Sequence, residues 1–314
     1  MSLRPLGTTG LSIAPLVLGG NVFGWTADRS ASFAILDAFI AGGGTMIDTA
    51  DVYSAFAPGN VGGESETILG AWLRARGRRD DVQIATKVGM LSGTGGDKLA
   101  PGRIAAAIDE SLARLGTDYV DLYYAHQDDE DVPQEAVAAA FDALVRAGKV
   151  RTLGASKFSA ARLESALDIS ARGGLAAYGV FQPLYNLVSR DSFEGELQAL
   201  TIARTIAVLP FYGLASGFLT GKYRTQADLQ GARASRVAPM LDARGLTVLA
   251  AMDAVAAETG ATLPQIALAW LMAKPGVTAP IASATSVAQM EELLGAMHLT
   301  LSAAQIARLD AAGA

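Results

Sequence analysis

Short apolar segments of strand length alternate with longer amphipathic segments along this 314-residue chain. The apolar segments, each expected to be a strand, lie at 16–20, 45–49, 82–87, 119–125, 150–155, 178–182, 206–211 and 277–281. The amphipathic segments, each expected to be a helix, lie near 30–42, 64–76, 102–115, 134–147, 159–172, 193–204, 244–259, 263–273 and 286–296. Eight such units in about 300 residues predict an α/β fold, the (β/α)8 TIM barrel.

The two ends of the chain predict additions to this barrel. Residues 5–15 (PLGTTGLSIAP) are rich in turn formers and predict an N-terminal β-hairpin before the first barrel strand. Residues 262–264 (TLP) and 301–303 (LSA) are typical of helix starts, and the second predicts an extra C-terminal helix. No low-complexity linker divides the chain, so we expect residues 1–314 to form a single barrel domain. The long polar segment 213–239 follows the seventh strand, and loops of this length are usually functional or mobile.

A doubly wound dinucleotide-binding fold is the competing α/β architecture. That fold places G-x-G-x-x-G between its first strand and the following helix. The glycines at 19, 20 and 24 have the wrong spacing, and the glycines at 42–44 follow a helix, where glycine commonly ends it. Any dinucleotide must therefore be bound without this fingerprint.

Composition excludes several classes of partner and site. The net charge of −6 disfavours nucleic acid, and the absence of cysteine excludes disulfides and thiolate metal sites. The chain has only two histidines, and no paired-carboxylate pattern indicates a metal, so we expect none. Glycine and proline interrupt the uncharged N-terminal stretch and every later apolar stretch, so neither a signal peptide nor a membrane span is expected. A cytoplasmic protein is the resulting expectation.

Titratable side chains stand where expected strands end. Asp48 and Tyr53 belong to TMIDTADVY (45–53), Lys87 ends VQIATK (82–87), and His126 ends DYVDLYYAH (118–126). A parallel barrel gathers the carboxyl ends of its strands around one cavity. These four side chains therefore predict a proton-transfer site.

The role of Lys87 decides what this site does. A lone strand-end lysine is more often a surface residue, and a buried one is a Schiff-base nucleophile only if its pKa is depressed. A carboxylate on the neighbouring strand, Asp48, favours the ammonium instead. That ammonium is expected to lower the pKa of the Tyr53 phenol from its usual value near ~10. Proton transfer at neutral pH needs a shift of roughly three units. His126, otherwise a core histidine, would then orient a carbonyl oxygen.

Six segments in order resemble the aldo-keto reductases. They are IDTADVY, ATK, DLYYAH, GASKF (154–158), VFQPLYNL (180–187) and LASGFLTGKY (214–223), and they cover nearly the whole chain. The resemblance is strongest to the branch with bacterial stress-related reductases and potassium-channel β subunits. It implies a catalytic tetrad of Asp48, Tyr53, Lys87 and His126, with Tyr53 as general acid in the reversible reduction of small aldehydes or ketones to alcohols.

The same resemblance implies a nicotinamide cofactor in the barrel mouth. Ser156 and Gln182 would hold the carboxamide, and Phe211, with Tyr212 beside it, would stack on the ring where the family usually has Tyr. The remaining residues that the resemblance implies for the cofactor are Gly19, Gly20, Asn21, Asp48, Lys157, Gly213, Leu214, Ser216, Gly217, Lys222, Ser283, Thr285, Gln289 and Glu292.

Three positions depart from the family pattern. Lys157 replaces an Asn after Ser156, Thr285 stands at the position of an Arg that binds the cofactor 2′-phosphate, and Leu293 replaces an Asn at the adenine. NADPH is the expected cofactor, and NADH is possible because the arginine is missing. Lys222 or Arg224 could supply the charge instead.

Two other functions stay open from sequence. One is a regulatory or redox-sensing subunit that binds cofactor with weak turnover, and the other is a Schiff-base lyase that uses Lys87. Trp25 and Phe56 could line a substrate pocket, whereas Trp72 is expected to pack within a helix layer. The substrate and the oligomeric state are not readable from the sequence.

Overall fold

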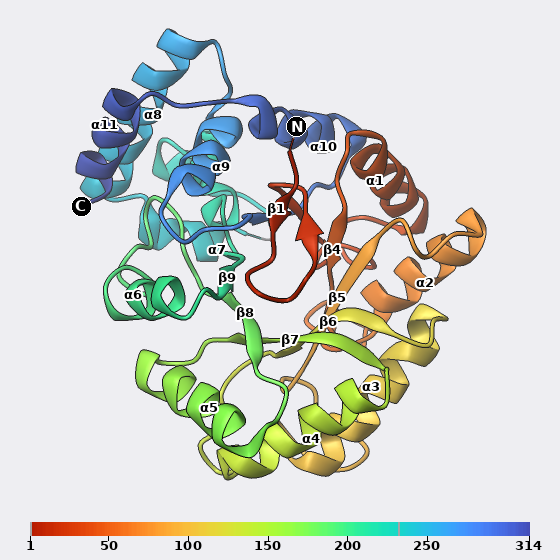
Figure 1. The fold of residues 1–314 in the computed structure, drawn as a ribbon. Helices are drawn as coiled ribbons and strands as arrows, with labels where there is room; N and C mark the ends of the chain where they lie inside the picture. The colour runs from red at the N-terminus through yellow and green to blue at the C-terminus, as the bar shows by residue number, and fades with distance from the viewer. Residues whose placement is uncertain (1, 232) are drawn as a thin grey trace.

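The computed structural model of the protein describes residues 2–231 and 233–314; Met1 and Ala232, which fall within the expected domain, lie outside the described residues. The barrel strands are β3 (Val17–Gly19), β4 (Met46–Asp48), β5 (Gln83–Val88), β6 (Val120–Ala125), β7 (Val150–Ser156), β8 (Tyr178–Gln182), β9 (Ala207–Val208) and β10 (Ile281–Ala282). All are parallel to their neighbours, in the order β10-β3-β4-β5-β6-β7-β8-β9. The expected TIM-barrel architecture is confirmed (Figure 1).

Helices surround the strands on the outside of the sheet (Figure 1). They are α1 (Arg29–Ala41), α2 (Glu64–Arg76), α3 (Pro101–Leu115), α4 (Gln134–Arg146), α5 (Ala160–Gly173), α6 (Glu196–Ala203), α8 (Ala243–Thr259), α9 (Leu263–Ala273), α10 (Val287–Gly295) and α11 (Ala303–Gly313). The two expected helix starts are confirmed, because Thr262 and Ser302 each form a capping box, with Gln265 and Gln305 respectively. None of the helices described is by itself long and apolar enough to cross a membrane; α8 and α9 pass that test only as a pair, and they bend by 97° where they meet.

The last two barrel strands are shorter than the sequence predicted. The expected strands 206–211 and 277–281 are reduced to β9 and β10. Pro210 follows β9 and Pro280 precedes β10, and neither residue has an N–H to continue a ladder. The barrel still closes here, because Thr278 N donates to Val208 O at 2.9 Å and Ile281 N donates to Pro210 O at 2.8 Å.

The N-terminal hairpin closes one end of the barrel. Its strands β1 (Arg4–Pro5) and β2 (Ser12–Ile13) are antiparallel, as expected. Leu6 and Ile13 are fully buried in the apolar cluster that fills the barrel interior. At Gly7 (φ +56°) a Cβ would come within 2.7 Å of Thr205 O, so only glycine allows the hairpin to pack this closely on the start of β9. The functional cavity must therefore lie at the opposite end.

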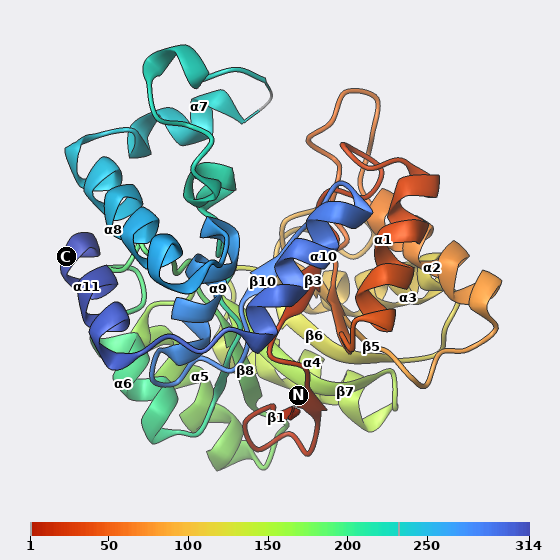
Figure 2. The same ribbon diagram turned by 90° about the horizontal axis from the view of Figure 1, so that it is seen from above.

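The long segment after β9 stands at that opposite end (Figure 2). It contains three short 3-10 helices, at Ala215–Thr220, Gln226–Asp228 and Ala238–Met240, and the single-turn α7 (Ala234–Val237). Figure 2 shows α7 far above the sheet and the hairpin below it. The expected irregular loop is thus a partly helical arm beside the carboxyl ends of the strands.

Candidate active site

A cavity of about 880 Å³ opens at the carboxyl ends of the barrel strands. Most of the residues expected to bind cofactor or substrate line it, namely Gly19, Asn21, Asp48, Tyr53, His126, Ser156, Lys157, Gln182, Phe211, Tyr212, Gly213, Leu214, Ser216, Gly217, Lys222, Ser283, Thr285, Gln289 and Glu292. Gly20 and Lys87 do not line the cavity and lie behind the residues that do. Cofactor and ligand cavities commonly have 300–1,000 Å³, so the space suits a large organic cofactor.

Lys87 holds three of its neighbours together. Its fully buried ammonium donates hydrogen bonds to Asp48 Oδ2 at 2.5 Å, to Thr49 O at 2.7 Å and to Tyr53 Oη at 2.9 Å. These three bonds use all three N–H donors of an ammonium group. Burial lowers the pKa of Lys87, and the adjacent Asp48 carboxylate opposes that shift. A lysine bonded in this way has no access to a carbonyl substrate, which disfavours the Schiff-base alternative.

Asp48 is the centre of the arrangement. Its Oδ2 accepts from Lys87 and, at 3.3 Å, from Tyr53 Oη, while its Oδ1 accepts from Gln182 Nε2 at 2.9 Å. Ser156 Oγ donates to the carbonyl oxygen of Gln182 at 2.8 Å. Residues from β4, β5, β7 and β8 are thereby joined across the barrel mouth. Since Ser156 and Gln182 also line the cavity, the pair expected at the carboxamide is positioned by the same network.

The Tyr53 phenol stays protonated in this environment. Burial, and then the charge of Asp48, raise the pKa of Tyr53 well above its usual value. This reverses the sequence expectation that Lys87 lowers that pKa. The physical reason is that Asp48 offsets much of the lysine charge while the phenol is removed from water. A phenol that keeps its proton is the form that a general acid needs.

His126 is a neutral imidazole beside Tyr53. The two ring centroids are 6.0 Å apart, with the rings at 75° to one another. Burial, and then the charges of Lys87 and Lys157, lower the pKa of His126 well below its usual value. Its Nδ1 is buried and has no hydrogen-bond partner among the residues described. A neutral imidazole can donate one hydrogen bond, which suits an interaction with a carbonyl oxygen.

The glycines of the first strand leave space that side chains would fill. A Cβ at Gly19 would lie 2.5 Å from Ser283 Oγ, and that hydroxyl donates to Asn21 Oδ1 at 2.5 Å. A Cβ at Gly20 would lie 2.9 Å from Ser65 Oγ. Only glycine therefore fits the packing at these two positions, and Gly19 adds no side chain to the cavity wall. The donor set along the wall, made of amides, hydroxyls and glycine backbone, fits a nicotinamide and its ribose.

The opposite wall comes from the segment after β9. Phe211 and Tyr212 stack edge to face, with centroids 5.2 Å apart. Tyr212, Ala215 and Ser216 all have left-handed backbone, as does Gly217 (φ +99°). Such a run of unusual conformations in non-glycine residues is typical of functional sites. These residues and Lys222 form a tight cationic turn in the position expected for the pyrophosphate.

At the end of the cavity where the adenosine phosphate was expected, the charged residues differ from those predicted. Thr285 donates through both N (2.9 Å) and Oγ1 (3.0 Å) to Gln289 Oε1. Arg224 does not reach the cavity, because it binds Asp253 through two bonds of 2.8 Å. Arg233 and Arg236 line the cavity instead, and the sequence analysis missed both. The only sequence signal for them was their position in the long segment after the seventh strand.

Aromatic residues surround the substrate side. Trp25 and Phe56 line the cavity in an edge-to-face pair with centroids 5.0 Å apart, as the sequence suggested. Trp72 lies outside the cavity in α2, where its Nε1 donates to Asp37 Oδ1 at 2.8 Å, so its expected packing role is confirmed. Within the described residues no group of three or more His, Cys, Asp or Glu side chains could hold a metal ion.

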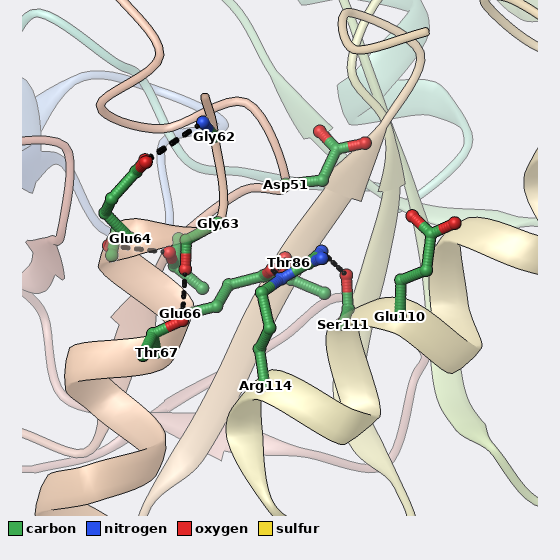
Figure 3. Close-up of polar contacts among 12 residues, drawn as sticks. Asp51, Gly62, Gly63, Glu64, Glu66, Thr67, Thr86, Glu110, Ser111 and Arg114 are labelled. Atoms are coloured by element: carbon green, nitrogen blue, oxygen red, sulfur yellow. Dashed lines mark hydrogen bonds and ion pairs between the residues drawn. The ribbon is translucent and has the colours of Figure 1, made fainter. Parts of the chain in front are cut away.

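A buried ionic layer supports the site from behind (Figure 3). Glu66 accepts from Thr86 Oγ1 at 2.5 Å and from Arg114 Nε at 2.6 Å, which ties α2 and α3 to the strand residue next to Lys87. Asp51 lies beside this group with both carboxylate oxygens buried and without a hydrogen-bond partner in the described part of the chain. The nearest guanidinium nitrogen, Arg103 Nη2, is 3.8 Å from Asp51 Oδ2.

Asp51 is expected to make stability depend on pH. Burial, and then the charge of Glu66, raise its pKa to about 7, whereas an unfolded chain has a value near ~3.9. The folded state therefore holds the proton more tightly, and stability should fall as pH rises from about 4 to about 7. Asp51→Asn cannot ionise, so at pH 8 it should be more stable than wild type by about 2–4 kcal/mol. Urea unfolding at pH 4 and 8 measures this, and an equal difference at both pH values would contradict it.

Comparisons with known proteins find similar sequences over nearly the whole chain. A sequence model of the Aldo/keto reductase family matches residues 15–314. An uncharacterized oxidoreductase, YrpG, of Bacillus subtilis (strain 168) is 31% identical over 96% of this chain and 92% of its own length. L-glyceraldehyde 3-phosphate reductase of Escherichia coli (strain K12) is 30% identical, over 99% and 92% respectively. A putative voltage-gated potassium channel subunit beta of Schizosaccharomyces pombe is 33% identical, over 94% and 88%.

Proposed function

Because the chain belongs to the aldo/keto reductase family, an NAD(P)H-dependent class of oxidoreductase, we propose that it reduces small aldehydes or ketones to alcohols with Tyr53 as general acid. The observation that carries the proposal is the convergence of Asp48, Tyr53 and Lys87 with His126 at one cavity. An ammonium, a protonated phenol and a neutral imidazole together can bind and protonate a carbonyl oxygen. The reaction is reversible, and Tyr53 would act as the base in oxidation.

Each side chain has a defined task in this proposal. When bound, the reduced nicotinamide supplies a hydride to the carbonyl carbon. Tyr53 donates its proton to the carbonyl oxygen, and Lys87 stabilises the phenolate that forms because its ammonium already donates to Tyr53 Oη. His126 donates a hydrogen bond to the same carbonyl oxygen and orients it. Asp48 keeps Lys87 charged and in place.

The cofactor would lie along the wall described above. Ser156 and Gln182 would hold the carboxamide, and Phe211 or Tyr212 would cover the ring. The turn from Gly213 to Gly217, with Lys222, would bind the pyrophosphate. Thr285, Gln289 and Glu292 would bind the adenosine end. Each residue named here lines the cavity, which supports the proposal.

NADPH is the proposed form of the cofactor, although Thr285 replaces the family arginine. Lys222, Arg233 and Arg236 line the cavity, and the described residues provide none of them with a salt bridge. Free guanidinium groups can bind a 2′-phosphate in place of the missing side chain. We expect NADPH to bind about tenfold more tightly than NADH, and Arg236→Gln to reduce that ratio. Fluorescence titration of both cofactors measures it, and tighter binding of NADH to wild type would contradict it.

The proposed activity is tested by incubating the protein with NADPH or NADH and a panel of small aldehydes and ketones. Consumption of the reduced cofactor, with equimolar alcohol formed, is the expected result. Consumption no faster than that of Tyr53→Phe would contradict the proposal. A tight cofactor complex with negligible turnover on every carbonyl would favour the regulatory alternative instead.

A further inference from the structure

The cavity carries an excess of positive charge in an acidic protein. The chain has a net charge of −6, yet Lys157, Lys222, Arg233 and Arg236 all line the cavity. Glu292 is the one acidic residue among the described lining residues apart from Asp48, which is paired with Lys87. Three of the four cations belong to the arm after β9, where the proposed cofactor phosphates would lie. Lys157 comes from the other side, after β7.

Strand order places the Lys157 ammonium above His126. Its Nζ lies 3.5 Å from the sulfur of Met90, a residue that follows β5. Strand β6 lies between β5 and β7 and ends immediately before His126. The register pairs Ala125 with Ala155, so Lys157 stands one residue farther along its strand than His126 does. Because Lys157 and Met90 follow the two strands that flank β6, the lysine side chain spans the end of β6, which His126 directly follows.

Lys157 has no counter-ion in this position. Its side chain is exposed at the cavity, and none of the salt bridges among the described residues includes it. Its hydrogen-bond partner is a thioether, which is a weak acceptor. Its charge also contributes to the lowered pKa of His126, after burial and the charge of Lys87. An unpaired ammonium at the wall of a cavity is free to form a charge-assisted hydrogen bond with an anion that enters it.

The backbone of Lys157 is also held in an unusual conformation. Its φ is +58°, a left-handed value that non-glycine residues adopt rarely. The next residues fix it, because Phe158 is buried and Ser159 caps α5 by accepting from Arg162 N. The side chain is therefore directed over the cavity by the fold.

We propose that Lys157 is a specificity-determining residue that binds an anionic group, a carboxylate or a phosphate, on the carbonyl substrate. The inference rests on the proposed function, since His126 would hold the carbonyl oxygen directly beneath the ammonium. The preferred substrates are then carbonyl compounds with the anionic group a few bonds from the carbonyl carbon. Trp25 and Phe56 would cover the apolar part of such a molecule.

The test compares Lys157→Met, which keeps length and removes charge, with Lys157→Arg, which keeps charge. Two matched substrate pairs are used: succinic semialdehyde against butanal, and glyceraldehyde 3-phosphate against glyceraldehyde. Lys157→Met should lower kcat/KM for an anionic member by about 10–100-fold, mainly through KM, as expected for a lost hydrogen bond to a charged group. The loss is measured relative to the neutral member of each pair, so that any effect on cofactor binding cancels, and Lys157→Arg should retain most of the preference.

The two substrate pairs separate the sources of negative charge. A preference confined to the carboxylate pair, or to the phosphate pair, identifies the anion and supports the proposal. Equal losses on anionic and neutral substrates in Lys157→Met, with weaker binding of cofactor, would overturn it in favour of a role at the carboxamide. If the wild-type enzyme reduces the neutral and the anionic substrate of each pair equally well, the proposed role of Lys157 is overturned, whereas the proposed carbonyl reduction still holds.

A binding measurement keeps the inference testable without turnover. Butyrate and glycerol 3-phosphate lack a reactive carbonyl, and each is titrated calorimetrically into wild type and Lys157→Met with saturating oxidised cofactor. Binding of at least one anion that is lost in Lys157→Met and retained in Lys157→Arg is expected. Equal binding, or no binding, in all three proteins would overturn the proposal even if the protein proved inactive on every carbonyl.

Discussion

Tyr53→Phe is expected to lower kcat for aldehyde reduction by about 10²–10⁴-fold, the usual contribution of a positioned general acid. The phenol beside His126 is half-buried and protonated, and it accepts a hydrogen bond from an ammonium. Phenylalanine keeps the ring and its contact with His126 but removes the proton that the carbonyl oxygen needs. Because only the hydroxyl is lost, the affinity for cofactor and KM should change little. Steady-state kinetics together with cofactor titration separate these effects.

A second tyrosine provides the matched control. Tyr123 on β6 is fully buried, and its hydroxyl has no hydrogen-bond partner within the described part of the structure. It faces the helix layer, where its ring lies 5.6 Å from that of Phe141. Tyr123→Phe removes the same atom from the same kind of residue and should leave kcat unchanged. A similar loss in both variants would show that Tyr53 acts through packing and would contradict its role as acid.

The polar residues at the ends of the central strands were predictable from the sequence, because few positions in the fold suit them. A polar side chain that ends an apolar run, as at Asp48 or His126, has nowhere to lie except the barrel mouth, so the cavity could be expected without coordinates. Helix starts at Thr262 and Ser302 were equally readable, since a capping box is a local feature.

The features of the site that could not be predicted from the sequence depend on contacts between residues that are distant in the chain. The elevated pKa of Tyr53 follows from burial at the barrel mouth and from the charge of Asp48, which residue types alone do not fix. Arg236 reaches the cavity only because of the path of a long arm, whereas Arg224 is held by Asp253 on α8. The ammonium of Lys157 reaches Met90, 67 residues away in the chain, because β5 and β7 lie on either side of β6 in the sheet. Sequence motifs locate the titratable side chains, but the charges of these side chains depend on how the protein packs around them.

Lys87→Met should destabilise the fold by about 3–5 kcal/mol, the usual cost of leaving one member of a buried ion pair without its partner. Lys87 and Asp48 are 0% and 2% exposed, so solvent cannot replace the lost charge. In the variant, Asp48 keeps the bonds from Gln182 and Tyr53 but loses its cation. Urea unfolding at pH 8 measures the loss.

The double variant Asp48→Asn with Lys87→Met distinguishes charge from packing. If the loss in Lys87→Met comes from an uncompensated carboxylate, removing that charge as well should restore about 2–3 kcal/mol, because replacing both members of a buried pair is often close to neutral. Gln182 can still donate to the carbonyl oxygen of the amide introduced by Asp48→Asn, so the packing across the barrel is retained. Both variants should remain inactive, since neither has an ammonium to stabilise the Tyr53 phenolate. A double variant no more stable than Lys87→Met would mean that the lysine supports the fold by its volume and hydrogen bonds, and that Asp48 is satisfied without it.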